Sequence, residues 1–259
     1  MRAPVCGALL LFFLAGLVAT PPAQARGLCP APWYHDRGVV RQVFDGDTLE
    51  LSDGRRVRLL GINTPELGHD ERPPEPFAEP ARTFLESLAP PGSRVRLRLD
   101  SESHDRYGRL LAHVFLSDGV NVQAELLAAG LAMTLVVPPN EWNHRCYDSL
   151  EDAARSESRG IWRLDRFRPV AADRLSEKFR GFRIVRGRIL RIGEGRKNLW
   201  LNLAPMVAIR IPKDDLAYFD SLPPRSLLRR RVEVRGYVER RRGELRITVR
   251  HPAAIEVID

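Results

Sequence analysis

The amino-acid sequence predicts a mainly β protein of the α+β class, in which a small β-barrel with helices on its outside is followed by a second small β-barrel. Short segments of alternating apolar and polar residues recur along most of the chain, and this alternation is typical of half-buried strands. Helical patterns are few and lie in the first part of the chain. After Trp162 the pattern changes to strands almost alone, which indicates a second unit.

These changes divide the 259 residues into four parts. We expect a signal peptide, a first barrel, a polar and basic linker, and a second barrel, over residues 1–25, 26–162, 163–180 and 181–259. The length left after the signal peptide is enough for one large or two small domains.

The first 25 residues have the layout of a secretory signal peptide. They begin with Met-Arg, continue with the apolar run VCGALLLFFLAGLVA and end with Ala23-Gln24-Ala25. This run has about 15 residues, whereas a membrane-spanning helix needs roughly 20, which favours a signal peptide over an anchor. No other segment is apolar and long enough to cross a membrane, so we expect no membrane span after its removal. The protein is then exported, either to the periplasm or out of the cell. An uncleaved anchor is the alternative.

The elements of the first barrel follow from local patterns. The Asp53-Gly54 dipeptide between alternating segments predicts a hairpin. We expect strands at residues 39–44, 48–52, 55–62, 94–100 and 109–119, and helices at residues 81–88, 122–132 and about 141–159.

The second barrel is predicted by strand patterns alone. They lie at residues 182–193, 198–203, 207–212 and 230–252, the last a hairpin that turns near Arg242-Gly243. About five short strands in about 80 residues are what a small closed barrel of the OB kind requires.

The charge of the chain points to a polyanionic partner. The formal net charge is +8, and the lysines are only Lys178, Lys197 and Lys213, so arginine carries almost all of the basicity. Arginine donates two hydrogen bonds at once to a phosphate. A basic exported protein suggests nucleic acid or an anionic surface as the partner. Nucleotide bias in the genome is an alternative source of the arginines.

Cys29 and Cys146 are the cysteines that remain beyond residue 25. In an exported protein two cysteines more often pair than stay free. We therefore expect a disulfide that ties the N-terminal arm to a late helix, and no metal role.

The segment FDGDTLEL begins at Phe44 and contains two close carboxylates. If residues 43–51 form one strand, Asp45 and Asp47 lie on the same face, where a hard cation such as Ca²⁺ or Mg²⁺ would neutralise them. A surface turn without an ion is the alternative. Glu66 and Arg58 lie close by in sequence, and acids beside arginines suit phosphoryl transfer.

The order of three motifs resembles the staphylococcal nuclease-like (thermonuclease) family over about residues 37–162. The motifs are VFDGDTLEL, RVRLLGINTPE and DRYGRLLAHVF, followed by a helix that ends in Ala-Gly-Leu-Ala. The resemblance implies an OB-fold barrel with attached helices. It also implies Ca²⁺-dependent hydrolysis of DNA and RNA with little sequence preference, with single-stranded or denatured substrates preferred, by a monomer.

The resemblance assigns roles to residues of this chain. Asp47 matches a calcium-binding aspartate and Thr64 a residue whose backbone carbonyl binds the ion, and Asp45 adds a carboxylate beside them. The other matching residues act on the substrate: Arg58 and Arg109 clamp the reacting phosphate, Glu66 orients or activates the attacking water, and Tyr107 with Arg106 contacts a substrate phosphate.

The chain departs from the family at two places. A second calcium-binding aspartate falls at Asn63, whose carbonyl can bind Ca²⁺ but brings no charge, so we expect weaker or altered metal binding. A second tyrosine, which stacks on the nucleotide, falls near residues 135–137, which are Leu-Val-Val. Lower affinity for a mononucleotide is expected.

The last hairpin is bracketed by two arginine triplets, residues 229–231 and 240–242. They indicate either a solvated basic hairpin or a groove for a sugar–phosphate backbone, with Trp200 or Tyr237 as a stacking platform. The leading hypothesis is an exported, Ca²⁺-dependent nuclease. The alternatives are a secreted nucleic-acid-binding protein whose barrel has lost catalysis, which Asn63 suggests, and an envelope adhesin that binds through arginine patches.

Overall fold

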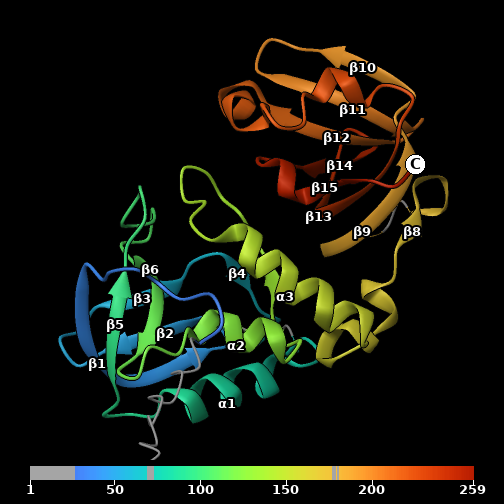
Figure 1. The fold of residues 1–259 in the computed structure, drawn as a ribbon. Helices are drawn as coiled ribbons and strands as arrows, with labels where there is room; N and C mark the ends of the chain where they lie inside the picture. The colour runs from blue at the N-terminus through green and yellow to red at the C-terminus, as the bar shows by residue number, and fades with distance from the viewer. Residues whose placement is uncertain (1–26, 69–72, 177–178, 180) are drawn as a thin grey trace, which may run out of the picture.

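A computed structural model describes residues 27–259 except 69–72, 177–178 and 180. The expected signal peptide, residues 1–25, lies outside the described residues. Two β units lie one above the other in Figure 1, with helix α3 between them. No helix within the described ranges combines the length and the apolar character that crossing a membrane requires.

The first unit is a closed barrel with the strand order β1-β2-β3-β6-β5. Its strands are β1 (Asp36–Asp45), β2 (Thr48–Leu51), β3 (Arg56–Leu59), β5 (Arg94–Arg98) and β6 (Leu110–Leu116). Neighbours are antiparallel except β3 and β6, which run parallel. Apolar side chains such as Leu49, Leu59 and Leu97 are fully buried inside. This confirms the expected barrel.

Three helices cover the first barrel, namely α1 (Ala78–Leu88), α2 (Val122–Ala128) and α3 (His144–Ser156). Helix α1 begins three residues earlier than expected, because Pro80 fits the first turn of a helix. Asn121 caps the N-terminus of α2, where its side chain accepts a hydrogen bond from the Ala124 amide. It is shorter than expected and is followed by Gly130 at φ 69°.

Two further connections fix the helices. The short strands β4 (Ile62–Asn63) and β7 (Met133–Thr134) pair antiparallel and bring the end of the β3 segment to the start of the α3 segment. A disulfide joins Cys29 to Cys146 of α3, with 5.8 Å between the Cα atoms and a sequence separation of 117. The N-terminal arm is thereby held against α3.

The second unit is an eight-stranded sheet with the order β10-β11-β12-β14-β13-β9-β8, and β15 pairs with β13. Its strands are β8 (Val170–Ala171), β9 (Gly181–Arg188), β10 (Arg191–Glu194), β11 (Asn198–Ala204), β12 (Val207–Pro212), β13 (Arg231–Arg241), β14 (Glu244–Thr248) and β15 (Ile255–Val257). Short 3₁₀ helices connect the elements: η1 (Gly160–Arg163), η2 (Asp165–Phe167), η3 (Ala172–Arg174), η4 (Lys213–Phe219), η5 (Pro224–Leu227) and η6 (Pro252–Ala254).

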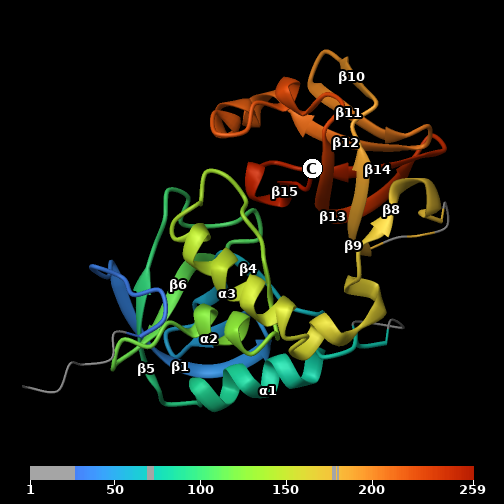
Figure 2. The ribbon, with the colours of Figure 1, turned by 45° about the vertical axis from the view of Figure 1, so that its right-hand side comes forward.

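This sheet repeats the strand order of the first barrel. β9 and β10 are consecutive pieces of one segment, interrupted only at Ile189-Leu190. The β9 piece pairs with β13 and the β10 piece with β11, while β12 and β14 run parallel as β3 and β6 do. The curved sheet in Figures 1 and 2 therefore has the OB arrangement that the sequence predicts.

The expected linker, residues 163–180, contains regular secondary structure where it is described. It contains η2 and η3, and β8 pairs in parallel with β9, so this segment adds an edge strand to the second sheet. Phe167 within it is buried in an apolar cluster that also contains Trp162 and Phe182. A two-residue strand carries no period, so the sequence alone could not reveal it.

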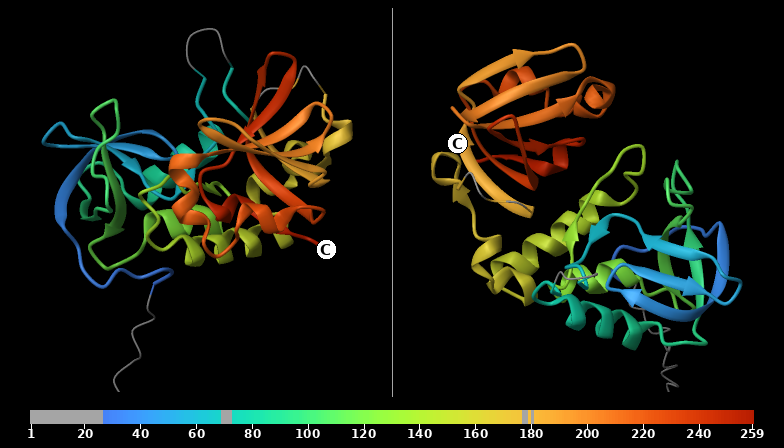
Figure 3. Two further views of the ribbon diagram at one scale, coloured as in Figure 1. Left: turned by 90° about the horizontal axis from the view of Figure 1, so that it is seen from above. Right: turned by 180° about the vertical axis from the view of Figure 1, so that it is seen from behind.

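The two units are joined by one face of β13. Side chains alternate along a strand, and Glu233, Arg235 and Tyr237 all reach the first unit. Glu233 accepts a hydrogen bond from Arg155 of α3 at 2.7 Å. Arg235 forms ion pairs with Glu151 of the same helix and with Asp148, the latter at 3.2 Å. Figure 3 shows α3 and β13 on the facing sides of the two units.

The ion pair of Arg235 with Glu151 is buried. Burial raises the pKa of the Glu151 carboxyl, and Arg235 opposes that rise. Burial alone would lower the pKa of Arg235, but the acids around it hold that pKa above its usual range. Removing one partner of such a pair leaves an uncompensated buried charge. This pair therefore acts together with the pair of His251 and Glu141 and with the apolar cluster around Phe182 to hold the two units against each other.

Candidate active site

The Asp45-Gly46-Asp47 segment is a tight turn between β1 and β2. β1 ends at Asp45 and β2 begins at Thr48, so the separate strands expected at residues 39–44 and 48–52 are present and the condition of one strand over residues 43–51 is not met. The Asp47 amide donates a hydrogen bond to Asp45 Oδ1 at 3.0 Å. A Cβ on Gly46 would lie 2.7 Å from the Ala81 Cβ and 2.8 Å from Thr64 Oγ1. Glycine therefore lets the turn press against the Thr64 segment.

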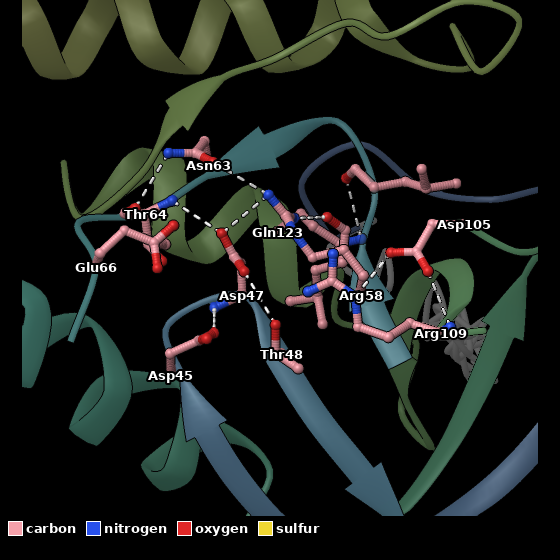
Figure 4. A network of polar contacts seen from close by, with 12 residues as sticks. Asp45, Asp47, Thr48, Arg58, Asn63, Thr64, Glu66, Asp105, Arg109 and Gln123 are labelled. Carbon is pink, nitrogen blue, oxygen red and sulfur yellow. Dashed lines mark hydrogen bonds and ion pairs between the residues drawn. The ribbon is translucent and has the colours of Figure 1, made fainter. Parts of the chain in front are cut away.

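Asp47 is the centre of a buried hydrogen-bond cluster, shown in Figure 4. Its Oδ2 accepts the Thr64 amide at 3.1 Å and lies 3.1 Å from Nη2 of Arg58. Its Oδ1 accepts the Thr48 hydroxyl at 3.2 Å. The cluster thus joins the β1–β2 turn, strand β3 and the residue after β4.

Asn63 shares the guanidinium of Arg58 with Asp47. Arg58 Nη2 donates to Asn63 Oδ1 at 3.2 Å. The Asn63 amide nitrogen donates to the Thr64 carbonyl at 3.1 Å and to the hydroxyl of Tyr237 at 3.1 Å. Asn63, which stands where the family has a charged metal ligand, is thereby hydrogen-bonded to Tyr237 of the second unit.

Asp45 has a different environment from Asp47. Burial, followed by the neighbouring Asp47 charge, raises the pKa of the Asp45 carboxyl to about 6. Hydrogen bonds from the Asp47 amide and the pull of Arg58 act in the opposite direction. Two carboxyls that close repel each other, and a positive charge between them would relieve that repulsion.

Arg109 lies on the other side of Arg58 from Asn63 in Figure 4, on the loop before β6 that also contains Tyr107. Arg109 Nε donates to Asp105 Oδ2 at 2.7 Å, and its amide donates to Oδ1 at 3.0 Å. Burial acts to raise the pKa of the Asp105 carboxyl, but the hydrogen bonds from Arg109 and from the Tyr107 amide outweigh it and hold that pKa below its usual value. Asp105 is therefore the residue that orients Arg109, a role the sequence did not assign.

Tyr107 is 69% exposed, and its hydroxyl accepts a hydrogen bond from Arg106 at 2.6 Å. The guanidinium groups of Arg106 and Arg109 lie 4.8 Å and 5.7 Å from the centre of its ring. An open depression of about 460 Å³ is lined by Tyr107, Arg109 and the β2–β3 turn. These side chains form an accessible basic and aromatic surface.

Glu66 is exposed and follows the Thr64-Pro65 segment. Its backbone bonds to the Glu75 segment in both directions, with the Glu66 amide 3.2 Å from Glu75 Oε2 and the Glu75 amide 2.9 Å from the Glu66 carbonyl. Its carboxylate turns toward Asp47 in Figure 4. The structure thus brings together Asp45, Asp47, Arg58, Asn63, Thr64 and Glu66, with Arg109 beside them. Arg106 and Arg109 both contact the ring of Tyr107. Cys29 and Cys146 form a disulfide apart from this site.

Tyr237 is the contact of this site that sequence reasoning did not place. It lies 174 residues from Asn63 in the chain. The available signal was the polar face of β13, on which Glu233, Arg235 and Tyr237 alternate with buried valines. That pattern predicts a strand but not which partner its polar face meets.

No group of three or more His, Cys, Asp or Glu side chains suited to a metal ion occurs among the described residues. Besides the carboxylate of Asp47, the hydrogen-bond cluster contains a carboxylate oxygen of Asp45, the Asn63 amide oxygen and the Thr64 carbonyl. A metal bound here would therefore use amide and carbonyl oxygens together with two carboxylates.

The geometry defines an OB-barrel protein in which an arginine–carboxylate cluster suited to a phosphate lies at the first turn of a closed barrel. A family model described as staphylococcal nuclease homologue matches residues 56–164. The chain belongs to the staphylococcal nuclease family, which places it among the nuclease hydrolases.

Individual relatives agree with this assignment. The chain is 35% identical over 127 residues to a thermonuclease of Staphylococcus intermedius, covering 48% of this chain and 74% of the relative. It is 28% identical over 161 residues to a thermonuclease of Staphylococcus hyicus, covering 61% of this chain and 93% of the relative. It is 32% identical over 137 residues to endonuclease YhcR of Bacillus subtilis (strain 168), covering 48% of this chain but only 11% of that relative.

Proposed function

We propose that the protein is an exported nuclease that hydrolyses phosphodiester bonds of DNA and RNA with little sequence preference and depends on Ca²⁺. The observation that carries the proposal is the single cluster in which Asp47 binds Arg58 and the Thr64 amide, with Glu66 and Arg109 beside it. The relatives whose names are thermonuclease and endonuclease support it.

Calcium fits the donor set of this cluster. Ca²⁺ binds carboxylate, amide and backbone carbonyl oxygens in flexible geometry. Asp45, Asp47, Asn63 and Thr64 supply these groups and no sulfur or imidazole. When bound, the ion supplies positive charge to the phosphate and orients water.

The side chains of this chain perform the remaining steps. Arg58 and Arg109 neutralise the charge that develops on the phosphate oxygens in the transition state, each with donors that Asp47 and Asp105 hold in place. Glu66 accepts a proton from the attacking water or orients it. Tyr107 and Arg106 contact a neighbouring phosphate from their exposed loop.

The second unit binds substrate in this proposal. The end of β13 and the turn after it carry arginines 240–242, and with Arg210 and Arg246 they line an open depression of about 500 Å³. OB barrels bind oligonucleotides through this loop and through the loop between their first two strands. The substrate is a single-stranded or denatured nucleic acid, the protein acts as a monomer, and the leader at residues 1–25 directs export to the periplasm or the medium.

The test is degradation of denatured DNA and of RNA by residues 26–259 while Ca²⁺ is titrated, with EDTA as the control. We expect cleavage that EDTA abolishes and Ca²⁺ restores. Tight, salt-sensitive binding without cleavage at millimolar Ca²⁺, Mg²⁺ or Mn²⁺ would instead favour the second candidate, a binding protein without catalysis. Asn63, which carries no charge at a metal-ligand position, is the observation that favours that candidate.

A further inference from the structure

A cavity of about 240 Å³ lies at the junction of the two units. The first unit contributes Asn63, strand β7 and residues 135–137, and the second contributes β13, the end of β14 and η6. Its volume is below the roughly 300–1,000 Å³ of pockets for drug-sized ligands. A single flat ring system is the class of ligand that it accommodates.

The cavity is continuous with the candidate active site through one residue. Asn63 lines the cavity and, in the same side chain, accepts a hydrogen bond from Arg58 at 3.2 Å. Arg58 in turn lies 3.1 Å from Asp47. A group bound in the cavity is thus one side chain away from the arginine proposed to hold the reacting phosphate.

Tyr237 supplies an aromatic wall that is accessible and fixed. It lines the cavity and remains 46% exposed. Its hydroxyl accepts a hydrogen bond from the Asn63 amide at 3.1 Å. Phe182 packs against its ring at 6.0 Å between centroids with an angle of 78° between the ring planes. A ring held at two points is preorganised for stacking, which limits the entropy lost on binding.

The opposite end of the cavity leads toward positive charge. Glu239 and Thr248 line both this cavity and the arginine-lined depression of β13 and β14. Tyr237, Glu239 and Arg241 share one face of β13, which leads from the cavity to this depression. Aromatic platforms that alternate with basic side chains are the pattern that binds single-stranded nucleic acid.

We propose that the junction cavity binds one base of a single-stranded nucleic acid next to the scissile phosphate, with the base stacked on Tyr237. The backbone then continues over β13 and β14 to the arginines of the second unit. The inference rests on the proposed function for the identity of the ligand. Both units contribute residues to this base-binding site, so neither unit would form it alone.

Binding of a short fluorescein-labelled oligothymidylate in excess EDTA tests the proposal without cleavage. Tyr237→Leu removes the ring but keeps apolar volume, and we expect it to weaken binding about tenfold, within the range for loss of one stacked base. Tyr237→Phe keeps the ring and changes affinity by less than about threefold, because it loses one hydrogen bond. Leu190→Ala, at a side chain of the second unit that is 58% exposed, is the control for surface truncation.

An oligonucleotide of the same length built from abasic sites separates stacking from general loss of affinity. On this probe we expect wild type and Tyr237→Leu to bind equally, as in a double-mutant cycle. An equal loss on both probes, or no loss on either, overturns the proposal. If Tyr237→Leu weakens binding only of the base-containing probe but no condition yields cleavage, the cavity stands and the nuclease proposal fails. If the wild type cleaves nucleic acid but Tyr237→Leu binds the base-containing probe as tightly as the wild type, the nuclease proposal stands and the cavity proposal fails.

Discussion

The two barrels of this protein share a strand order but differ in the charge at their first turn. Between β1 and β2 the first barrel has Asp45-Gly46-Asp47, and between β10 and β11 the second has Glu194-Gly195-Arg196-Lys197. Glu194 is bonded to Lys213 and Arg225. The same turn is thus acidic where a cation is proposed to bind and basic where only a phosphate backbone is proposed to bind.

A second difference lies on the strand that follows. Arg58 of β3 pairs in register with Thr48, whereas Arg210 of β12 pairs in register with Trp200. The guanidinium of Arg246 lies 4.7 Å from the centre of the Trp200 ring. Fold does not specify chemistry, and here one strand order supports a carboxylate cluster in one copy and an arginine–aromatic surface in the other.

The largest expected effect concerns stability, because the first barrel is tied by a disulfide and the second contains no cysteine. Replacing Cys29 and Cys146 by alanine should lower the free energy of unfolding by about 4–5 kcal/mol in the chain-entropy model. Urea unfolding followed by circular dichroism measures this. A reducing agent should lower the stability of the wild type but not that of the double variant. Equal sensitivity of both would show that the bridge does not stabilise the protein.

The value of kcat should depend on Arg58 of β3 but not on Arg210, which lies on the corresponding strand β12 of the second barrel. Arg58→Ala should lower kcat about 10²–10³-fold, the usual loss for one donor to a transition-state oxyanion. Arg210→Ala should leave kcat within about twofold and act on substrate affinity instead. Steady-state kinetics on denatured DNA supply both numbers. Similar losses of kcat for the two variants would contradict the division of roles between the barrels.

A negative charge at position 63 should lower the Ca²⁺ concentration that the first barrel requires for cleavage. Asn63→Asp adds a carboxylate to the cluster, and the Ca²⁺ concentration for half-maximal cleavage should fall by about tenfold, because affinity follows ligand charge. Asn63→Ser, which adds no charge, is the matched control. An unchanged or higher Ca²⁺ requirement in Asn63→Asp would mean that position 63 does not reach the ion.

The smallest expected effect is on the salt dependence of nucleic-acid binding, and it concerns the basic turn between β10 and β11 of the second barrel. Removing Arg196 and Lys197 together should reduce the slope of log affinity against log salt by roughly 0.7 for each phosphate of a single strand that the protein no longer neutralises. Arg168→Ala, at an exposed arginine outside both turns, is the control. Anisotropy titrations over a range of NaCl concentrations measure the slope, and an unaltered slope in the double variant would exclude this turn from the binding surface.

Much of the fold followed from the sequence, because the strong signals were local. The turns at Asp53-Gly54 and Arg242-Gly243 connect the expected hairpins, and Arg242 and Gly243 have φ values of 52° and 87°. The strands β8 and β15 were not predicted, because two or three residues carry no readable period.

In the candidate site too, the residues close together in the sequence could be predicted and the contact between the two barrels could not. Asp47, Arg58 and Asn63 lie within 17 residues of one another, on the β1–β2 turn, β3 and β4. They could be grouped from the sequence, although their hydrogen-bond partners could not. Tyr237 could be considered as a stacking platform on the last hairpin, but its contact with Asn63 depends on how two separate barrels dock. No spacing within one barrel encodes that docking, so only the structure reveals it.

The buried pair of Glu151 and Arg235 has a consequence for engineering this protein. A shortened chain that stops after Trp162 would keep the cluster around Asp47 and Arg58 but leave the Glu151 carboxylate and the apolar Met133 and Ala154 without their cover. Such a fragment should show lower solubility and lower activity for reasons unrelated to the chemistry of the cluster. Transplanting the nuclease barrel into another protein would first require a redesigned outer face of α3.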